Sequence, residues 1–376
     1  MRRELVTPRP GWQEKVEKLG FDFYNLDGKA YWTEQACYVL SSAQVDEIEA
    51  ATEELHGICL KAVDHVVSNR LWQRMQINPA WGDYIERVWR RGDPTICGRF
   101  DLVYDGNGPP RMLEYNADTP TSLYEASVVQ WYWLKDVRPD ADQFNSIHDK
   151  LVDAWKDVAK KLPPNATIHF ARFEDHPEDL ATSEYLRDTA LQAGLTGKPL
   201  GIPQIGWNGR RFTDVEETPI QVMSKLYPWE WMMREAFGAF VPTDTTAFIE
   251  PVWKLILSNK MLLPLLWEGF PNHPNLLPAF DKEHPDLKGS FVKKPIFGRE
   301  GHNVTLVAPG LFDTAGGSYG TEGFVWQGYQ PLPNFDGNHA LVGSWVIGGK
   351  AAGVGMREDE RRITHNSSRF VPHYFE

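Results

Sequence analysis

Two short segments near residue 100 alternate between polar and apolar side chains, which is the pattern of a strand with one buried face. The first runs from Cys97 to Asp105 and the second from Met112 to Asn116. Between them the chain reads Asp-Gly-Asn-Gly-Pro-Pro, a run of turn-forming residues. This pattern predicts an antiparallel β-hairpin.

Helical spacing of apolar residues dominates the stretch that precedes the hairpin and returns after it. Ser41 and Gln44 form a capping-box pattern. Apolar residues follow at helical spacing and predict a long amphipathic helix: Val45, Ile48, Leu55, Ile58, Ala62 and Val66. Two further helices are predicted at 123–135 and 144–162, and a strand, a helix and a strand at 167–173, 179–194 and 199–205 predict a small β-α-β unit.

The last third of the chain is rich in predicted strands. Gly348-Gly349 is the expected turn between the final two. An antiparallel sheet bearing nucleotide contacts is expected from strands at 290–297, 304–308, 324–329, 340–347 and 351–356.

Composition and charge narrow the class of protein. The chain has 376 residues, is 42% hydrophobic and carries a formal charge of −12. Binding to nucleic acid without sequence specificity, or to an anionic membrane, needs clustered positive charge. The negative net charge argues against both, so small molecules are the expected partners. The most apolar stretch, 255–267, contains Lys260 and Pro264 and is too short to span a bilayer. Without a secretory signal, a cytoplasmic location is expected.

The hairpin gathers a set of polar side chains on one face. Side chains at i and i+2 share a face of a strand. Pairing the apolar faces of the two strands therefore brings Arg99, Asp101, Glu114 and Asn116 together. On the returning strand, Met112 is expected on this polar face and Leu113 and Tyr115 on the opposite one.

Two carboxylates and an amide are oxygen ligands of the kind that magnesium binds, and a nearby arginine suits a phosphoryl group. A solvated face with a salt bridge is the alternative interpretation of the same pattern. The run of small polar residues at 116–122 favours the metal site, because it leads into a predicted helix whose N-terminus can receive an anion. Lys293 and Lys294 add a second signal, since whichever of them faces inward needs an anionic partner.

Several motifs together resemble the glutathionylspermidine synthase family, and specifically its stand-alone synthetase-like branch of acid–amine ligases. The resemblance runs from about residue 12 to residue 376, and no counterpart of the amidase domain of bifunctional members is expected. The motifs are Arg99-Phe100-Asp101, Glu114-Tyr115-Asn116-Ala117-Asp118, Ser258-Asn259-Lys260 and the Lys294–Gly301 stretch.

The resemblance implies an α/β (α+β) protein with a permuted ATP-grasp fold. A small β-α-β, pre-ATP-grasp-like subdomain is expected as an insertion at about 140–235, and a strand-rich nucleotide-binding part at about 285–376. The family forms an amide between a peptide carboxylate and a polyamine, and converts ATP to ADP and phosphate.

The resemblance also implies roles for particular residues. Asp101, Glu114 and Asn116 would hold magnesium, with two ions expected, and Arg99 and Arg357 would be catalytic. The ATP-binding residues would be Arg99, Phe100, Asp101, Lys260, Lys294, Arg299, Gly301, Gln327, Arg362, Ile363 and Thr364. The substrate-binding residues would be Thr119, Thr121, Glu178 and Glu230.

The sequence therefore predicts an ATP- and magnesium-dependent ligase that joins an acid to an amine through an acyl-phosphate. Family members carry serines where this chain has Thr119 and Thr121, so the acid remains open, with a glutathione-like peptide as one candidate. A polyamine is a candidate for the amine. The alternatives are a nucleotide-binding partner protein without ligase activity and an ATP-dependent kinase.

Overall fold

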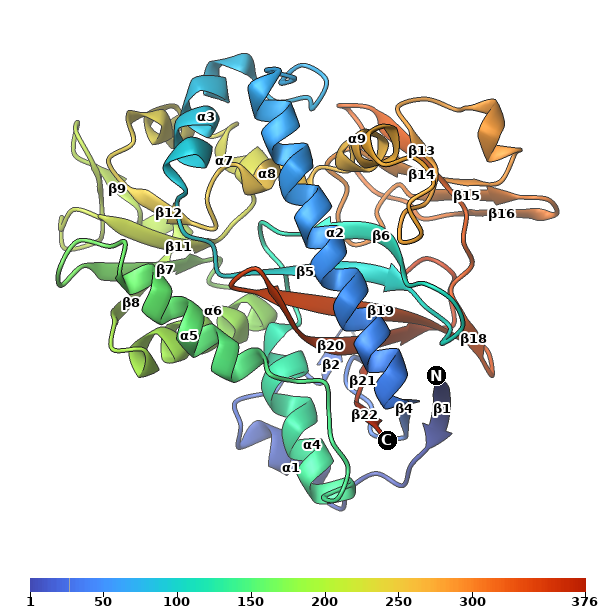
Figure 1. Cartoon of the computed structure of the whole chain (residues 1–376). Helices are drawn as coiled ribbons and strands as arrows, with labels where there is room; N and C mark the ends of the chain where they lie inside the picture. Colours follow the sequence, from blue (N-terminus) through green and yellow to red (C-terminus); the bar gives the residue numbers. More distant parts are fainter. Residues whose placement is uncertain (27) are drawn as a thin grey trace.

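The computed structural model describes residues 1–26 and 28–376 and has a mixed α/β architecture (Figure 1). Three larger sheets lie around the long helix α2 (Ser42–Ser68). One is antiparallel and central, one is antiparallel and lies near α9 (Leu262–Gly269), and one is parallel.

The predicted hairpin forms one edge of the central sheet, which has the order β21-β20-β19-β5-β6 with β18 paired to β19. Its strands are β5 (Cys97–Val103), β6 (Arg111–Asn116), β18 (Asn334–Phe335), β19 (Asn338–Ile347), β20 (Lys350–Asp359) and β21 (Arg369–Val371). Gly348 and Gly349 make the β19–β20 turn with positive φ angles, as predicted.

The hairpin register contains a bulge that the alternation pattern does not predict. Asp101 pairs with Glu114, but the next residue, Leu102, pairs with Met112. Leu113 is therefore the extra residue, and Met112 turns into the apolar core while Leu113 lines a cavity. The expected faces of Met112 and Leu113 were wrong, because an inserted residue shifts every side chain on one side of it to the opposite face.

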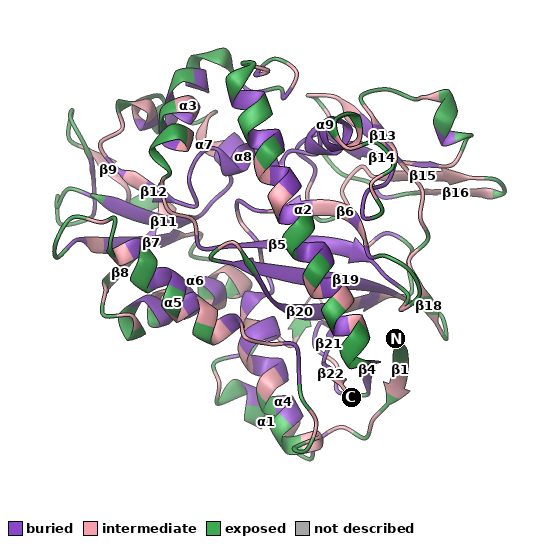
Figure 2. Cartoon of the chain, in the orientation of Figure 1, coloured by how far each residue is buried: buried purple, intermediate pink, exposed green. Residues whose placement is uncertain are grey.

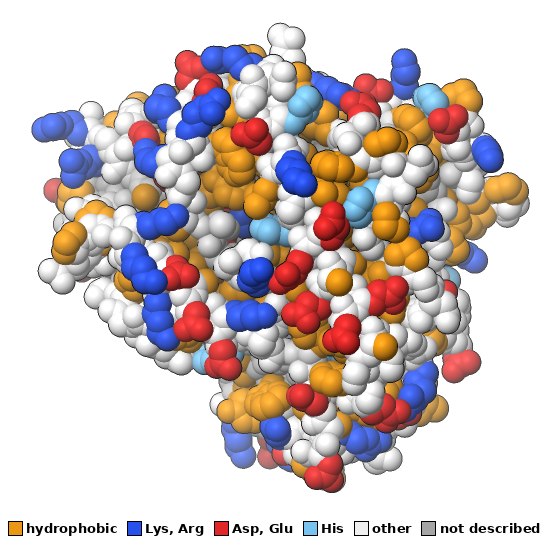
Figure 3. Space-filling view, viewed as in Figure 1, with side chains coloured by type: hydrophobic (Ala, Val, Ile, Leu, Met, Phe, Trp, Pro, Cys, Tyr) orange, Lys and Arg blue, Asp and Glu red, His pale blue; other side chains and the backbone are white. Residues whose placement is uncertain are grey.

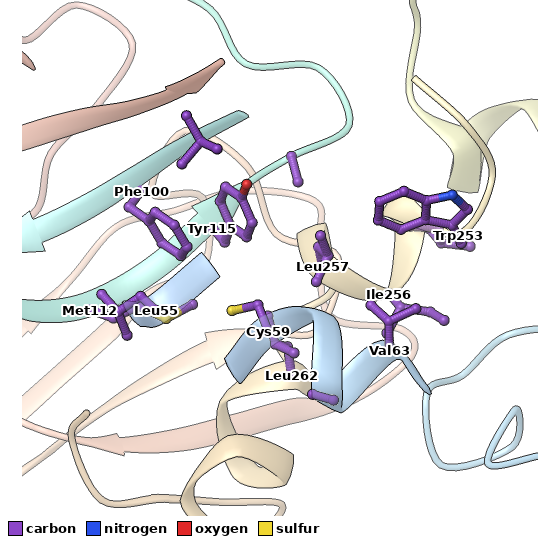
Figure 4. Close-up of a cluster of buried hydrophobic side chains, with 14 of the residues drawn as sticks. Leu55, Cys59, Val63, Phe100, Met112, Tyr115, Trp253, Ile256, Leu257 and Leu262 are labelled. Atoms are coloured by element: carbon purple, nitrogen blue, oxygen red, sulfur yellow. The ribbon is translucent and has the colours of Figure 1, made fainter. Parts of the chain in front are cut away.

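Helix α2 covers one face of the central sheet and contributes its apolar stripe to the main core. The Ser41 hydroxyl accepts from the Gln44 amide and the Gln44 side chain accepts from the Ser41 amide, which confirms the predicted capping box. Figure 2 shows buried positions on the sheet side of α2 and exposed positions facing outward. Figure 4 shows Cys59 of α2 close to Phe100 and Tyr115, whose rings stack at 3.8 Å between centroids.

The predicted β-α-β unit is present, although its second strand lies at Thr196–Gly201 and not at 199–205, and two further strands extend its sheet. Its parallel sheet has the order β12-β11-β7-β8. The strands are β7 (Thr167–Arg172), β8 (Thr196–Gly201), β11 (Val222–Leu226) and β12 (Ala247–Ile249), and the unit also contains α5 (Ile147–Ala159) and α6 (Pro177–Gln192).

The strands predicted in the last third are present, but they belong to two sheets. The earlier ones form a five-stranded sheet with the order β13-β17-β14-β15-β16, whereas β19 and β20 join the hairpin in the central sheet. The five strands are β13 (Ala279–Phe280), β14 (Phe291–Pro295), β15 (Thr305–Ala308), β16 (Leu311–Thr314) and β17 (Phe324–Gly328).

Smaller elements complete the fold. The predicted helix at 123–135 appears as a π-helical turn, Glu125–Val129, followed by α4 (Gln130–Val137). The other helices are α1 (Trp12–Glu17), α3 (Gly82–Arg91), α7 (Trp229–Met232) and α8 (Lys254–Ser258). A three-stranded sheet joins the two ends of the chain and contains β1 (Arg2–Leu5), β4 (Ala36–Leu40) and β22 (His373–Phe375). Two short strand pairs are β2 (Asn25–Leu26) with β3 (Lys29–Ala30), and β9 (Gly206–Trp207) with β10 (Phe212–Thr213).

On the face shown in Figure 3, acidic and basic side chains are interspersed. In the part of the chain that the structure describes, no helix combines the length and apolar character needed to cross a bilayer.

Candidate functional site

A cavity of about 630 Å³ lies between the β5–β6 hairpin, the five-stranded sheet and the segment that joins β7 to α6. Most of the residues that the sequence singles out meet on its wall. They are Arg99, Asp101, Glu114, Asn116, Thr119, Thr121, Glu178, Lys260, Lys294, Arg299, Gly301, Arg357, Arg362, Ile363 and Thr364. Three others, Phe100, Gln327 and Glu230, do not line it: Phe100 faces the core, and Gln327 and Glu230 lie behind residues that do.

The polar face of the hairpin forms one wall of the cavity. Arg99 donates from Nε and Nη2 to the two carboxylate oxygens of Asp101, at 2.7 and 3.2 Å, and from Nη1 to the Thr121 carbonyl at 2.6 Å. The Asn116 amide donates to Asp101 at 3.2 Å and to Glu114 at 3.0 Å. The two carboxylates therefore converge on one amide, because the register places Arg99 opposite Asn116 and Asp101 opposite Glu114.

This donor set fits magnesium. Among residues 1–26 and 28–376, no group of three or more His, Cys, Asp or Glu side chains is arranged to hold a metal ion. An ion at the hairpin would be held by Asp101, Glu114 and the side-chain oxygen of Asn116. A 180° rotation of the Asn116 amide group would direct that oxygen toward the carboxylates. Magnesium typically uses one or two protein carboxylates and completes its shell with phosphate and water oxygens.

Lys260, in the short segment between α8 and α9, faces Glu114. Its ammonium lies 3.1 Å from Glu114 and donates to the Gly298 carbonyl at 2.6 Å. Burial alone would raise the pKa of Glu114, but the charges of Lys260 and Lys294 outweigh burial and lower it to about 2. Glu114 is thus held as a carboxylate at neutral pH, the form that binds a metal ion.

Lys294, on β14, is the inward-facing member of the lysine pair. Its ammonium donates to the Leu113 carbonyl at 2.9 Å and to the Gln327 side chain at 2.7 Å. Burial lowers its pKa to about 8, although Glu114 opposes the shift. Lys293 points the other way and lies over the Phe324 ring at 4.2 Å. A phosphate in the cavity would supply the further negative charge that the buried Lys294 favours.

The loop between β14 and β15 closes another side of the cavity and contains Gly301. This glycine has a φ of +72°, and a Cβ atom there would lie 2.5 Å from the Thr364 carbonyl oxygen. Glycine is therefore needed both for the backbone conformation and for the close approach of the two loops. The second loop carries Arg362, Ile363 and Thr364.

The resemblance implies that Gly301 belongs to an ATP site. On this expectation, Gly301→Ala should raise the KM for ATP about tenfold, which corresponds to about 1.4 kcal/mol, because the two loops must separate. The left-handed backbone should cost a further 1–2 kcal/mol of stability, approximately. Gly310→Ala is the matched control: its φ is +73°, and a Cβ atom there meets no described residue within 4 Å. Steady-state kinetics and thermal unfolding separate the two effects, and an equal change of KM in both variants would contradict the loop contact.

Arg357, on β20, holds the loop that carries Arg362–Thr364. Its Nη2 donates to the carbonyls of His365, Asn366 and Ser368 at 2.8, 2.7 and 3.0 Å. Its Nε is buried and has no hydrogen-bond partner among residues 1–26 and 28–376, and the side chain lines the cavity. The Nη2 group thus anchors the loop, and the same side chain contributes to the cavity wall.

The 116–122 loop, which carries Thr119 and Thr121, is anchored by Asp118. The Asp118 carboxylate accepts from the Trp229 amide at 2.8 Å and forms a fully buried ion pair with Lys225. Its backbone amide donates to the Ser258 hydroxyl at 2.9 Å. These contacts tie the loop to β11, α7 and α8.

A group of acidic side chains around Glu178 was only partly predicted. Glu178 lines the cavity, and so does Asp179. Burial and the charge of Glu178 raise the pKa of Asp179 to about 7. Glu125 is fully buried in the π-helical turn and accepts from the Tyr31 hydroxyl at 2.6 Å. Burial and the charge of Glu178 raise the pKa of Glu125 to about 7. The sequence signal that marks Glu125 is an acid on the apolar face of a predicted helix.

Comparison with known proteins agrees with the motifs. The sequence model of the glutathionylspermidine synthase preATP-grasp family matches residues 3–376. A Haemophilus influenzae protein named as an acid–amine ligase is 41% identical over 393 residues, which span 100% of both chains. The bifunctional glutathionylspermidine synthetase/amidase of Escherichia coli is 26% identical over 89% of this chain and 58% of its own length.

The structure of a glutathione synthetase-like effector of Globodera pallida superposes with a TM-score of 0.54 at 10% identity and covers 99% of this chain and 98% of its own. This likeness shows a shared fold of the glutathione synthetase type. The family match and the acid–amine ligase relative confirm the predicted enzyme class. The chain therefore belongs to the glutathionylspermidine synthase family, a family of ATP-dependent carbon–nitrogen ligases.

Proposed function

We propose that the protein joins a carboxylic acid to an amine through an acyl-phosphate and releases ADP and phosphate. The proposed acid is a glutathione-like peptide and the proposed amine is a polyamine. The observation that carries the proposal is the meeting, in one cavity, of a carboxylate pair that suits magnesium with lysine and arginine side chains that suit a polyphosphate.

The nucleotide would lie between the five-stranded sheet and the hairpin. Lys260 and Lys294 would bind its phosphates, and the hydrogen bond from Lys294 to Gln327 supports this orientation of Lys294. The nucleotide would be enclosed by the loop that carries Arg362–Thr364 and by the β14–β15 loop, which contains Gly301. Magnesium, held by the hairpin carboxylates, would offset the charge of the phosphate oxygens.

In the first step, a carboxylate oxygen of the acid attacks the γ-phosphorus of ATP and ADP leaves. Arg99 and Arg357 stabilise the charge on the transferring phosphoryl oxygens. In the second step, the neutral amine attacks the acyl carbon, the carbon–oxygen bond to phosphate breaks and the amide forms. No covalent intermediate with the enzyme is needed.

The acid and the amine would occupy the end of the cavity away from the nucleotide. Thr119 and Thr121 offer hydroxyl groups to the acid, while Glu178 and Asp179 offer carboxylates to a cationic amine. Asp179 is suited to accept the proton that the amine must lose, because its pKa of about 7 lies near neutral pH. Glu230 lies behind Arg299, so we assign it to positioning instead of direct substrate contact.

For the domain organisation, we propose one glutathionylspermidine synthase-like unit over 12–376 with a permuted ATP-grasp arrangement. Within it, residues 140–235 form the inserted substrate-side subdomain and residues 285–376 the nucleotide-binding part. The parallel β7–α6–β8 arrangement supports the first assignment, and Lys294, Gly301 and Arg362 support the second.

We expect ADP release to require an acid and an amine together, because an acyl-phosphate in an enclosed site waits for its nucleophile. The assay follows ADP and phosphate against panels of peptides and other acids, with and without polyamines and amino acids. AMP and pyrophosphate as products would contradict the γ-phosphoryl mechanism. ADP with a stable phosphorylated acid would indicate a kinase, and ATP binding without turnover would indicate a nucleotide-binding partner protein.

A further inference from the structure

One side chain joins the nucleotide side of the cavity to the substrate side. Arg299 leaves the loop between β14 and β15 and donates from Nη1 to the Thr119 hydroxyl at 2.8 Å. Its Nε and Nη2 both donate to one carboxylate oxygen of Glu230, on α7, at 2.9 and 2.8 Å. Glu230 is buried, 5% exposed, and the guanidinium lines the cavity.

The loop that carries Arg299 has further contacts, which include two on the nucleotide side and a hydrogen bond from the Asn303 side-chain amide to the Tyr319 carbonyl. Lys260 donates to the Gly298 carbonyl at 2.6 Å, and Gly301 packs against the Thr364 carbonyl. Among these contacts, Arg299 is the one that joins the loop to Thr119 and Glu230 on the substrate side of the cavity. A charge-assisted fork to a buried carboxylate is among the stronger polar contacts in proteins.

The contact also orients Thr119. A hydroxyl has one proton to donate and two lone pairs that accept. Because the Arg299 nitrogen occupies one lone pair of Thr119, the hydroxyl proton remains available to an acceptor in the cavity. A carboxylate oxygen of the acid substrate is such an acceptor.

We propose that Arg299 is a positioning residue that holds the 298–303 loop closed against the acid side, so that the acyl-phosphate reacts with the amine and not with water. The inference rests on the proposed function. Without this contact, water would attack the acyl carbon and the carbon–oxygen bond to phosphate would break. The acid and inorganic phosphate would be released, and the net reaction would be hydrolysis of ATP to ADP and phosphate.

The chain offers a matched control. Arg234 forms an ion pair with Glu322, which also joins the segment after α7 to the five-stranded sheet. The Arg234 side chain is 58% exposed, and this pair is not part of the cavity wall. Arg234→Lys therefore makes the same substitution in a nearby ion pair without affecting the cavity wall.

The first experiment measures hydrogen exchange of the nucleotide-free protein, so it does not depend on ligation. The amides of Gly298, His302 and Val304 are hydrogen-bonded within the loop and report its opening. Arg299→Lys and Glu230→Gln should each speed their exchange about tenfold, and Arg234→Lys should leave it unchanged. Thr119→Ser should match the wild type, and Thr119→Val should exchange faster. Equal loop protection in wild type, Arg299→Lys and Glu230→Gln would overturn the proposal.

The second experiment uses the magnesium complex of β,γ-imido-ATP and then the acid found by the substrate panel. Arg299→Lys should release the analogue about tenfold faster, as loss of a closing contact predicts. It should also release ADP with acid alone, so that ADP formed exceeds amide formed. A variant that keeps one amide per ADP and the wild-type release rate would overturn the inference while leaving ligation intact. A wild-type protein that makes no amide would refute the proposed function instead.

Discussion

Replacement of Glu114 by glutamine should lower turnover about 1000-fold, the upper end of the usual effect of one electrostatic group in a preorganised site. The substitution keeps the shape of the side chain and its contact with Asn116, but it removes the charge that would hold magnesium. It also leaves Lys260 and Lys294 without the carboxylate between them. ATP should therefore still bind, while the affinity of the site for magnesium falls.

Turnover is measured against magnesium concentration, and ATP binding is measured by calorimetry in the same buffers. Circular dichroism should change little, because the Glu114 side chain is 27% exposed at the cavity and does not belong to the apolar core. Glu184→Gln is the control, since it removes a carboxylate that pairs with Arg187 on the surface of α6. Normal turnover with normal magnesium dependence in Glu114→Gln would show that the hairpin is only a solvated charged face.

Arg99→Lys should lower turnover about 100- to 1000-fold, or roughly 3–4 kcal/mol, with little change in ATP affinity. Arg99 forks to both oxygens of Asp101 and also reaches the Thr121 carbonyl. Lysine keeps the positive charge but cannot reproduce a planar set of donors directed at several oxygens. A single-turnover assay and a nucleotide-binding assay separate the two effects. A defect confined to ATP affinity would remove Arg99 from the catalytic assignment.

Arg357→Lys should lower turnover for the same reason, but its effect is less specific. The Arg357 Nη2 anchors three carbonyls of the loop that would enclose the nucleotide. Lysine would release part of this loop, so a loss of ATP affinity is expected beside the loss of turnover. Arg99 therefore provides the cleaner test of phosphoryl stabilisation.

Local alternation is enough to predict the β5–β6 hairpin and the meeting of its four polar side chains. Both depend on the two-residue period of a strand and on a turn between neighbouring segments. The bulge at Leu113 is not predictable in this way, because the alternation pattern assumes that residues of the two strands pair one to one. The pairing of β5 with β19 is equally hidden, since it joins segments more than 200 residues apart.

The resemblance to a known family predicts which residues meet at the cavity, but not how they support one another. Glu230 is one example, because its position behind Arg299 depends on where α7 lies against the β14–β15 loop. Glu125 is another, since the nearby Glu178, which together with burial raises its pKa, is not visible in the local sequence. Lys225, which holds Asp118, lies on a strand that periodicity does not predict.

Transfer of oxygen from the acid to phosphate tests the proposed reaction most directly. The acid identified by the substrate panel is labelled with oxygen-18 in its carboxylate and incubated with ATP, magnesium and the amine. Attack of the carboxylate on the γ-phosphorus predicts that each phosphate released carries one labelled oxygen and that the amide keeps the other. Unlabelled phosphate accompanying amide formation would contradict an acyl-phosphate intermediate.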